Sequence, residues 1–213
     1  MKNNLKHTVA ILLSGLITAP VLAQTPLPQH VQRSPWSITA SMGMGSFQYM
    51  ESTHGQTALG RLAFDYALTE YLGLEAGIQN GNHMRFALPH ETVNILGGVP
   101  VEGTTKPLLD LLVTAKTPTF NSALPLYGLI KGGAAYRQLQ MDRETVNDLT
   151  QIAPEFQAGI GYKVSKHLDV GLMVQYVAGK NPNVQADALT ETGKIANIPT
   201  QVAVFLGLTL TLE

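Results

Sequence analysis

Ten charged side chains recur at alternate positions of stretches that are otherwise apolar. Five are basic and five are acidic, and the phase of the alternation puts all ten on the same face of their stretches. They are Arg61, Asp65, Glu75, Asp110, Lys116, Lys131, Arg137, Glu155, Lys163 and Asp169. Opposite charges in equal number can form ion pairs and hydrogen bonds when they are removed from water together. We therefore expect these residues to form a buried structural network of salt bridges.

The stretches that carry these charges have a side-chain period of two, which is typical of β-strands with two different faces. In the clearest one, every second residue from Val202 to Leu212 is Val or Leu. Strands are expected at about 36–49, 58–69, 108–117, 126–141, 152–164, 168–177 and 202–212, and a further strand begins near Leu72. Pro154 has no N–H for a ladder, so we expect it at the beginning of its strand or at a bulge.

The links between the expected strands alternate in length. The long links are the first, third, fifth and seventh, at residues 50–57, 88–107, 142–151 and 178–199. Outer-membrane barrels have this organisation, with brief periplasmic turns, longer external loops and both termini inside. Eight strands of about 10 residues are also long enough, when tilted, to cross the hydrocarbon layer of a bilayer.

The composition favours a barrel whose charged face points inward. Charged residues make up only 14% of the chain, against about 25% in soluble domains. The charged face is also rich in glycine, which leaves room for long side chains in an eight-stranded interior that side chains just fill. These glycines are Gly43, Gly45, Gly77, Gly133, Gly159, Gly161, Gly171 and Gly207. We predict an all-β fold: an eight-stranded antiparallel up-and-down transmembrane β-barrel with short periplasmic turns, longer external loops and its aliphatic face against outer-membrane lipid.

The first 23 residues have the three parts of a secretory signal. Lys2 and Lys6 give a positive start, residues 8–19 are apolar, and Val21 and Ala23 suit the positions before a cleavage site. The apolar run is too short to span a bilayer as a helix. We expect a signal peptide at 1–23, a periplasmic lead-in at 24–35 and the barrel domain at 36–213.

Charge and cysteine content exclude several classes of function. Cleavage of the signal would leave 12 of the 14 Lys and Arg residues against 15 Asp and Glu, and no basic cluster is present, so we expect no nucleic-acid partner. The chain has no Cys, which excludes disulfides and Cys-based chemistry. It also contains no phosphate-binding loop, zinc-ligand spacing or dinucleotide fingerprint, so we expect no cofactor.

Two segments carry a resemblance to a known family. Residues 127–136 read YGLIKGGAAY and residues 154–162 read PEFQAGIGY. With the series of strands from Trp36 to Glu213, they resemble the OmpA-like and opacity-protein group of eight-stranded bacterial outer-membrane barrels. The resemblance implies a Gram-negative surface protein in the bacterial outer membrane, inserted by the barrel-assembly machinery. The sequence departs from the group in its last residues, LTLE, where the group usually ends in an aromatic residue that the machinery reads.

Three functions are compatible with such a barrel. The first is an outer-membrane surface protein with a side-chain-filled barrel, which acts in envelope integrity or contacts a surface or host partner through its loops. The second is a narrow channel or a conduit for apolar solutes, which a filled interior disfavours. The third is a lipid-modifying barrel enzyme.

An enzyme of this kind would need acid–base or nucleophilic side chains at its outer rim. The candidates are Ser52, His54, His83, His90, Glu91 and Asp142. They form no combination of His, Ser and acid at a recognisable spacing, and an exposed loop histidine is usually only solvated. We therefore expect that the protein is not an enzyme.

Overall fold

The computed structural model describes residues 34–48, 50–52, 57–120 and 125–212. The predicted signal peptide and residues 24–33 of the predicted lead-in lie outside these ranges. Among the described residues, no helix is both long enough and apolar enough to cross a membrane.

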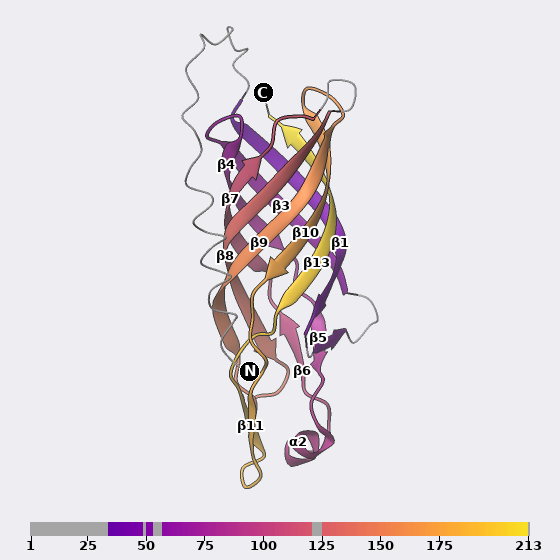
Figure 1. Ribbon diagram of the computed structural model, residues 1–213. Helices are drawn as coiled ribbons and strands as arrows, with labels where there is room; N and C mark the ends of the chain where they lie inside the picture. Colours follow the sequence, from indigo (N-terminus) through magenta and orange to yellow (C-terminus); the bar gives the residue numbers. More distant parts are fainter. Residues whose placement is uncertain (1–33, 49, 53–56, 121–124, 213) are drawn as a thin grey trace, which may run out of the picture. The chain divides into compact units, whose positions relative to one another are not determined.

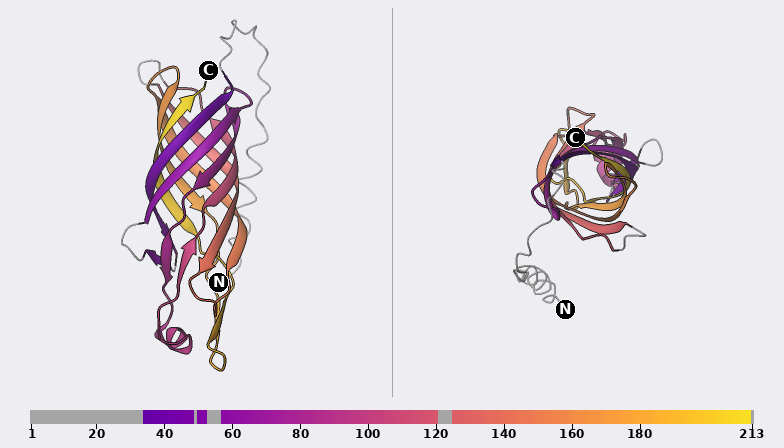
Figure 2. Two further views of the ribbon diagram at one scale, coloured as in Figure 1. Left: turned by 180° about the vertical axis from the view of Figure 1, so that it is seen from behind. Right: turned by 90° about the horizontal axis from the view of Figure 1, so that it is seen from above.

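Eight antiparallel strands close into a barrel, as Figure 1 and the view along the axis in Figure 2 show. They are β1 (Trp36–Phe47), β3 (Thr57–Ala67), β4 (Leu72–Gln79), β7 (Leu108–Lys116), β8 (Leu126–Met141), β9 (Leu149–Lys163), β10 (Leu168–Val177) and β13 (Gln201–Thr211). Each strand pairs with its neighbour in the chain, and β13 pairs with β1 from Ser37–Thr211 to Phe47–Gln201 to complete the ring. The predicted fold class is confirmed.

The side-chain alternation follows the expected phase along the closing seam of the barrel. On β1, Thr39 and Ser41 are buried toward the interior, whereas Met42 and Met44 are exposed on the outside. The register pairs Met42 with Leu206 on β13, so that apolar side chains continue across the seam on the outer face. A period of two therefore separates a lumen from an outer surface all around the barrel.

The two ends of the barrel differ in the links that they carry. At one end, which we call the turn end, lie the links that follow β3, β7 and β9, together with the last residues of β13 (Figure 1). The opposite end, the loop end, carries the links that follow β1, β4, β8 and β10. The two longest connections, after β4 and β10, lie at the loop end as predicted. The predicted alternation fails at one place, because the link after β8 (142–148) is shorter than the link after β7 (117–125) at the turn end.

The loop end is built from further elements, which we call the loop-end extension. Strands β2 (Met50–Ser52), β5 (His83–Phe86) and β6 (Glu102–Thr105) continue the wall between β1 and the end of β8. A separate hairpin of β11 (Val184–Asp187) and β12 (Thr192–Ile195) and the helix α2 (His90–Ile95) lie beyond them. The sequence analysis placed all these elements except β5 in links and did not recognise β5, because three- or four-residue strands are too short to show a period.

The loop-end extension has an apolar core. Its buried members come from β1, β2, β5, β8, the β12 hairpin and the connecting segments. They are Phe47, Met50, Met84, Phe86, Leu96, Val101, Leu139, Met141, Val146, Ile195 and Ile198. Burial of this much apolar surface gives the extension a hydrophobic core of its own beside the barrel.

Pro154 lies inside β9, which begins at Leu149, and the ladder with β8 continues through the pair Ala134–Pro154 without a shift of register. The expectation that this proline marks the start of its strand or a bulge is therefore wrong. The ladder between β9 and β10 ends at the pair Glu155–Val177, and the Pro154 carbonyl accepts only the N–H of Ala178 beyond it. The Pro154 nitrogen faces the same side of the strand as this carbonyl. The missing N–H thus falls where the ladder ends, which is a position that a proline tolerates.

Candidate functional site

The centre of the lumen holds a compact cluster of four charges from four strands. The Arg61 guanidinium donates to Glu75 Oε1 over 2.7 Å, and to Asp110 through Nη2 at 2.5 Å and Nε at 3.1 Å. Lys131 donates to the other Glu75 oxygen. All four side chains are almost fully buried, and their two positive and two negative charges balance. Buried charges are tolerated when they are paired in this way.

A glycine makes room for this cluster. A Cβ placed at Gly77 would lie 2.5 Å from Arg61 Nη2 and 2.6 Å from an oxygen of Asp110. Gly77 lies between Arg61 and Asp110, since its strand β4 pairs with β3 on one side and with β7 on the other. A larger residue would have to displace the ion pair, so this glycine is needed for the close approach of the charges.

Toward the loop end, the buried Glu155 is held by amides. Gln157 and Gln175 both donate to its Oε1, over 2.6 and 2.7 Å. Gln201 in turn donates to Gln175 over 3.3 Å. Neutral hydrogen-bond donors, which the sequence analysis missed, therefore hold Glu155 where a salt bridge was expected. Their signal was present, because these glutamines have the same strand phase as the charged residues.

Arg137 lies at the loop end of the lumen and binds mainly to backbone. Its guanidinium donates to the carbonyls of Pro199 and Ala178, over 2.7 and 2.9 Å, and to the Gln151 side chain over 3.0 Å. Pro199 and Ala178 bracket the long connection from β10 to β13. Arg137 thus ties this connection to the barrel wall instead of joining the ion pairs.

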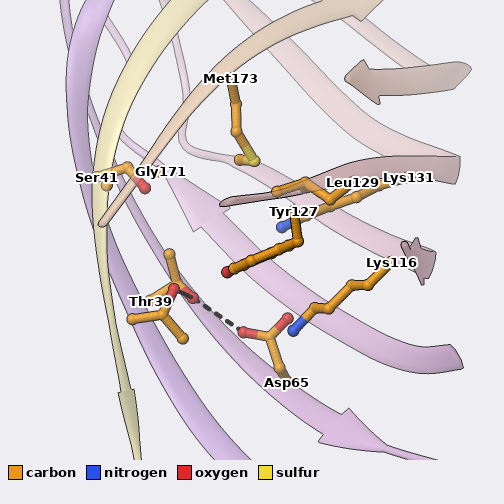
Figure 3. A pocket seen from close by; sticks show the side chains of 11 residues that line it. Thr39, Ser41, Asp65, Lys116, Tyr127, Leu129, Lys131, Gly171 and Met173 are labelled. Carbon is orange, nitrogen blue, oxygen red and sulfur yellow. Dashed lines mark hydrogen bonds between the residues drawn. The ribbon is translucent and has the colours of Figure 1, made fainter. Parts of the chain in front are cut away.

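The other four predicted charges lie toward the turn end. Asp65 accepts from Thr39 over 3.0 Å, and Figure 3 shows the Lys116 amine pointing toward Asp65. The Tyr127 hydroxyl donates to Asp169 over 2.9 Å, while the exposed Lys163 amine lies 5.9 Å from the centre of the Tyr127 ring. Lys163 is therefore at the mouth of the barrel and contacts an aromatic face.

Two small cavities lie on opposite sides of the central cluster. The cavity toward the turn end has a volume of about 30 Å³, enough for a few water molecules, and Asp65, Lys116 and Lys131 are among its lining residues (Figure 3). The cavity toward the loop end has about 20 Å³ and is lined in part by Gln79 and Arg137. The buried cluster of ion pairs stands between them in the lumen.

The outer surface of the barrel is a continuous apolar band. Leu111 is 65% exposed and Leu206 is 55% exposed, although both belong to the middle of their strands. In water such a band would be strongly unfavourable, whereas hydrocarbon solvates it. The strands that carry it are the membrane-spanning segments.

Aromatic residues flank this band. At the turn end, Trp36 and Tyr66 pack edge to face with their ring centres 4.7 Å apart, and both rings are partly exposed. Toward the loop end, Tyr136, Phe156 and Tyr176 are exposed. Two girdles of this kind are typical of barrels whose aromatic rings sit at the interfaces between lipid and water.

The candidate rim residues that the structure describes lie in the loop-end extension, but only some of them come together. His83 and Asp142 meet, and Glu102, which the sequence analysis did not single out, joins them. Hydrogen bonds from His83 and Arg85 hold the pKa of the Glu102 carboxyl below its usual range. The other candidates are not part of this group: His90 and Glu91 belong to α2, Ser52 ends β2, and His54 lies outside the described residues.

Comparison with solved structures supports the fold, although no family model and no curated protein matches the sequence. The chain is similar to the outer-membrane protein OprG of Pseudomonas aeruginosa, with 10% identity and a TM-score of 0.55 over 84% of this chain and 98% of that one. It is also similar to the outer-membrane protein AlkL in lipid bilayers, with 11% identity and a TM-score of 0.54 over 90% of this chain and 97% of that one. The chain therefore has the fold of the eight-stranded bacterial outer-membrane barrels.

Proposed function

We propose that this protein is a surface protein of the bacterial outer membrane, in which a filled barrel anchors the loop-end extension outside the cell. The observation that carries the proposal is the central cluster of Arg61, Glu75, Asp110 and Lys131, which occupies the lumen between two small cavities. A barrel filled in this way serves as an anchor. The extension and its links would then carry the function, which is either to support envelope integrity or to contact a surface or host partner.

The orientation is inferred from the two longest connections, after β4 and β10, which both lie at the loop end. In barrels of this fold the short turns face the periplasm and the long loops face outward. The loop-end extension accordingly projects from the cell, with its hydrophobic core stabilising a defined shape for contact with partners. Insertion would use the barrel-assembly machinery.

Labelling on intact cells tests the orientation, and the absence of native cysteine makes each label unique. We expect a membrane-impermeant maleimide to label Gln185→Cys, at the exposed hairpin of the extension, and to leave Lys166→Cys, at the turn end, unlabelled. Labelling of Lys166→Cys alone would overturn the proposed orientation.

Conductance tests the filled barrel against the channel alternative. Planar bilayers that contain the folded protein are expected to show no single-channel steps, because the central ion pairs occupy the lumen of a barrel whose interior side chains just fill. Reproducible steps in the wild-type protein would favour a channel. The conductance of the Glu75→Gly variant is compared with that of the wild-type protein, since this variant lacks the carboxylate that binds both Arg61 and Lys131.

A further inference from the structure

The outer face of the loop-end extension carries a set of potential metal ligands that is separate from the lumen. His83 is on β5, Glu102 is on β6 and Asp142 follows β8. His83 Nε2 lies 3.1 Å from Glu102 Oε2 and 3.3 Å from Asp142 Oδ2, and the ligand atoms of all three side chains lie within 4.8 Å of one another. We propose that these three residues form a binding site for a divalent transition-metal ion such as Zn²⁺.

The strand register places the two carboxylates against each other. The Asp142 N–H donates to the Glu102 carbonyl over 3.1 Å, one residue beyond the Gly103–Met141 pair of the ladder. Like charges in directly opposite positions of a sheet destabilise it. A cation held between the two carboxylates removes this repulsion, and the imidazole beside both of them supplies a third ligand.

The distances fit a small metal ion. Zinc binds His nitrogen and carboxylate oxygen at about 2.0–2.2 Å, so neighbouring ligand atoms of a tetrahedral site are about 3.3 Å apart. The separations of His83 Nε2 from Glu102 and from Asp142 are close to this value. An imidazole ligand favours zinc and its transition-metal neighbours over calcium and magnesium, which prefer oxygen alone.

Neighbouring side chains support the ligands in the manner of known metal sites. Thr104, directly opposite His83 in the ladder, contacts the second imidazole nitrogen, Nδ1, over 3.2 Å. Arg85 donates to Glu102 Oε1 over 3.0 and 3.1 Å, which leaves Oε2 directed to the imidazole. Such second contacts fix the orientation of ligating His and carboxylate groups and raise metal affinity.

The site is open to solvent and joins three parts of the extension. The side chains of His83, Glu102 and Asp142 are 36%, 29% and 40% exposed, so an ion can enter from the medium and retain water as a further ligand. A bound ion would cross-link β5, β6 and the end of β8. The inference does not depend on the proposed function, since the ligand geometry is independent of what the extension contacts.

The test is a zinc titration of the full mature chain, folded in detergent, without a histidine tag and freed of metal by a chelator. With a competing fluorescent chelator as the readout, we expect one saturable equivalent of Zn²⁺ per chain. His83→Ala and Asp142→Asn are expected to weaken binding by at least about tenfold. Thr104→Val, which removes only the support of the imidazole, is expected to weaken it by about tenfold as well.

His90→Ala is the matched control, because His90 belongs to α2 of the same extension and lies outside the proposed site. Heat-modifiable gel migration verifies that each variant is folded. Loss of zinc binding in folded His83→Ala, with binding retained in folded His90→Ala, would support the site. Absence of saturable binding in the wild-type protein, equal binding by wild type and His83→Ala, or displacement of Zn²⁺ by an equal concentration of Ca²⁺ would overturn it.

Discussion

The barrel and the loop-end extension differ in the polarity of the side chains that they bury. Inside the barrel, ion pairs and amides lie beside small apolar clusters such as Leu59, Ala203 and Phe205, and the outer face is aliphatic. Inside the extension lies an apolar core, and its outer face carries charged and polar groups such as Arg85 and Gln140. The same closed wall of strands thus serves two solvents, hydrocarbon around the barrel and water around the extension.

Strand β8 passes through both regions and changes its pattern on the way. In the barrel its inner face carries Lys131 and its outer face carries Ile130, whereas in the extension the inner face carries Leu139 and the outer face carries Gln140. With 16 residues the strand is longer than the 9–11 or so that a bilayer requires. The reversal begins just after Tyr136, and we infer that the strand leaves the lipid there.

The largest difference between the regions is expected for removal of a carboxylate. Glu75→Leu should destabilise the barrel by about 3–5 kcal/mol, because Arg61 and Lys131 would remain buried without their shared partner. Glu144→Leu, at an exposed position of the extension, should change stability by no more than about 0.5 kcal/mol. Urea unfolding in lipid vesicles measures both, and equal costs would contradict the assignment of a charged interior.

The next effect concerns apolar truncation. Leu139→Ala should destabilise the core of the extension by about 2–5 kcal/mol, because a closed cavity remains where the buried side chain was. Leu111→Ala on the outer face of the barrel should cost less, because lipid chains fill the space. Amide hydrogen exchange in β5 and β6 reports the first variant, and unchanged exchange there would contradict a packed core.

A charge added to the outer face should destabilise the protein in the barrel, where this face meets lipid, but not in the extension, where it meets water. Leu206→Arg, near the middle of β13, should destabilise the barrel by about 2–4 kcal/mol if this position meets the centre of the bilayer. The same charge introduced by Gln140→Arg, on the outer face of the extension, should change stability by no more than about 0.5 kcal/mol. Folding free energies in vesicles provide the comparison, and a neutral Leu206→Arg would place β13 outside lipid.

The smallest effect tests how tightly the charged interior is packed. Gly77→Ala should cost about 1–3 kcal/mol, because its new methyl group would collide with Arg61 and Asp110. Gly171→Ala is the control, since the nearest atom to a Cβ there is a carbonyl oxygen at an ordinary 3.5 Å. If both substitutions cost the same in urea unfolding, Gly77 is not needed to seat the ion pairs.

The sequence predicts the barrel well because each of its strands repeats one physical rule many times. Along β8 the predicted range 126–141 agrees with the structure, and on β13 the alternation of Val202 to Leu212 separates outside from inside. Chain-local patterns are sufficient here, because a side-chain period of two that continues over about ten residues is typical of a half-buried strand and not of a helix.

The extension and the details of the lumen could not be predicted in the same way. Strand β6 has four residues, and its identity as a strand depends on pairing with β5 and β8. Glu102 and Asp142 come close together only through that pairing, so no local spacing in the sequence predicts that they share a site. Likewise, charge parity identifies Arg137 as inward-facing, but its carbonyl partners at Ala178 and Pro199 depend on how a long connection folds back.

Spin labels along the outer face of β8 test the change of solvent most directly. The chain has no native cysteine, so single Cys substitutions at Ile130, Ala134, Tyr136, Gln138 and Gln140 can each be labelled uniquely. In vesicles we predict that labels at 130 and 134 are accessible to oxygen and shielded from a water-soluble nickel reagent, with the reverse at 140. Uniform access to the nickel reagent from 130 to 140 would contradict a lipid-facing barrel that continues into a water-exposed extension.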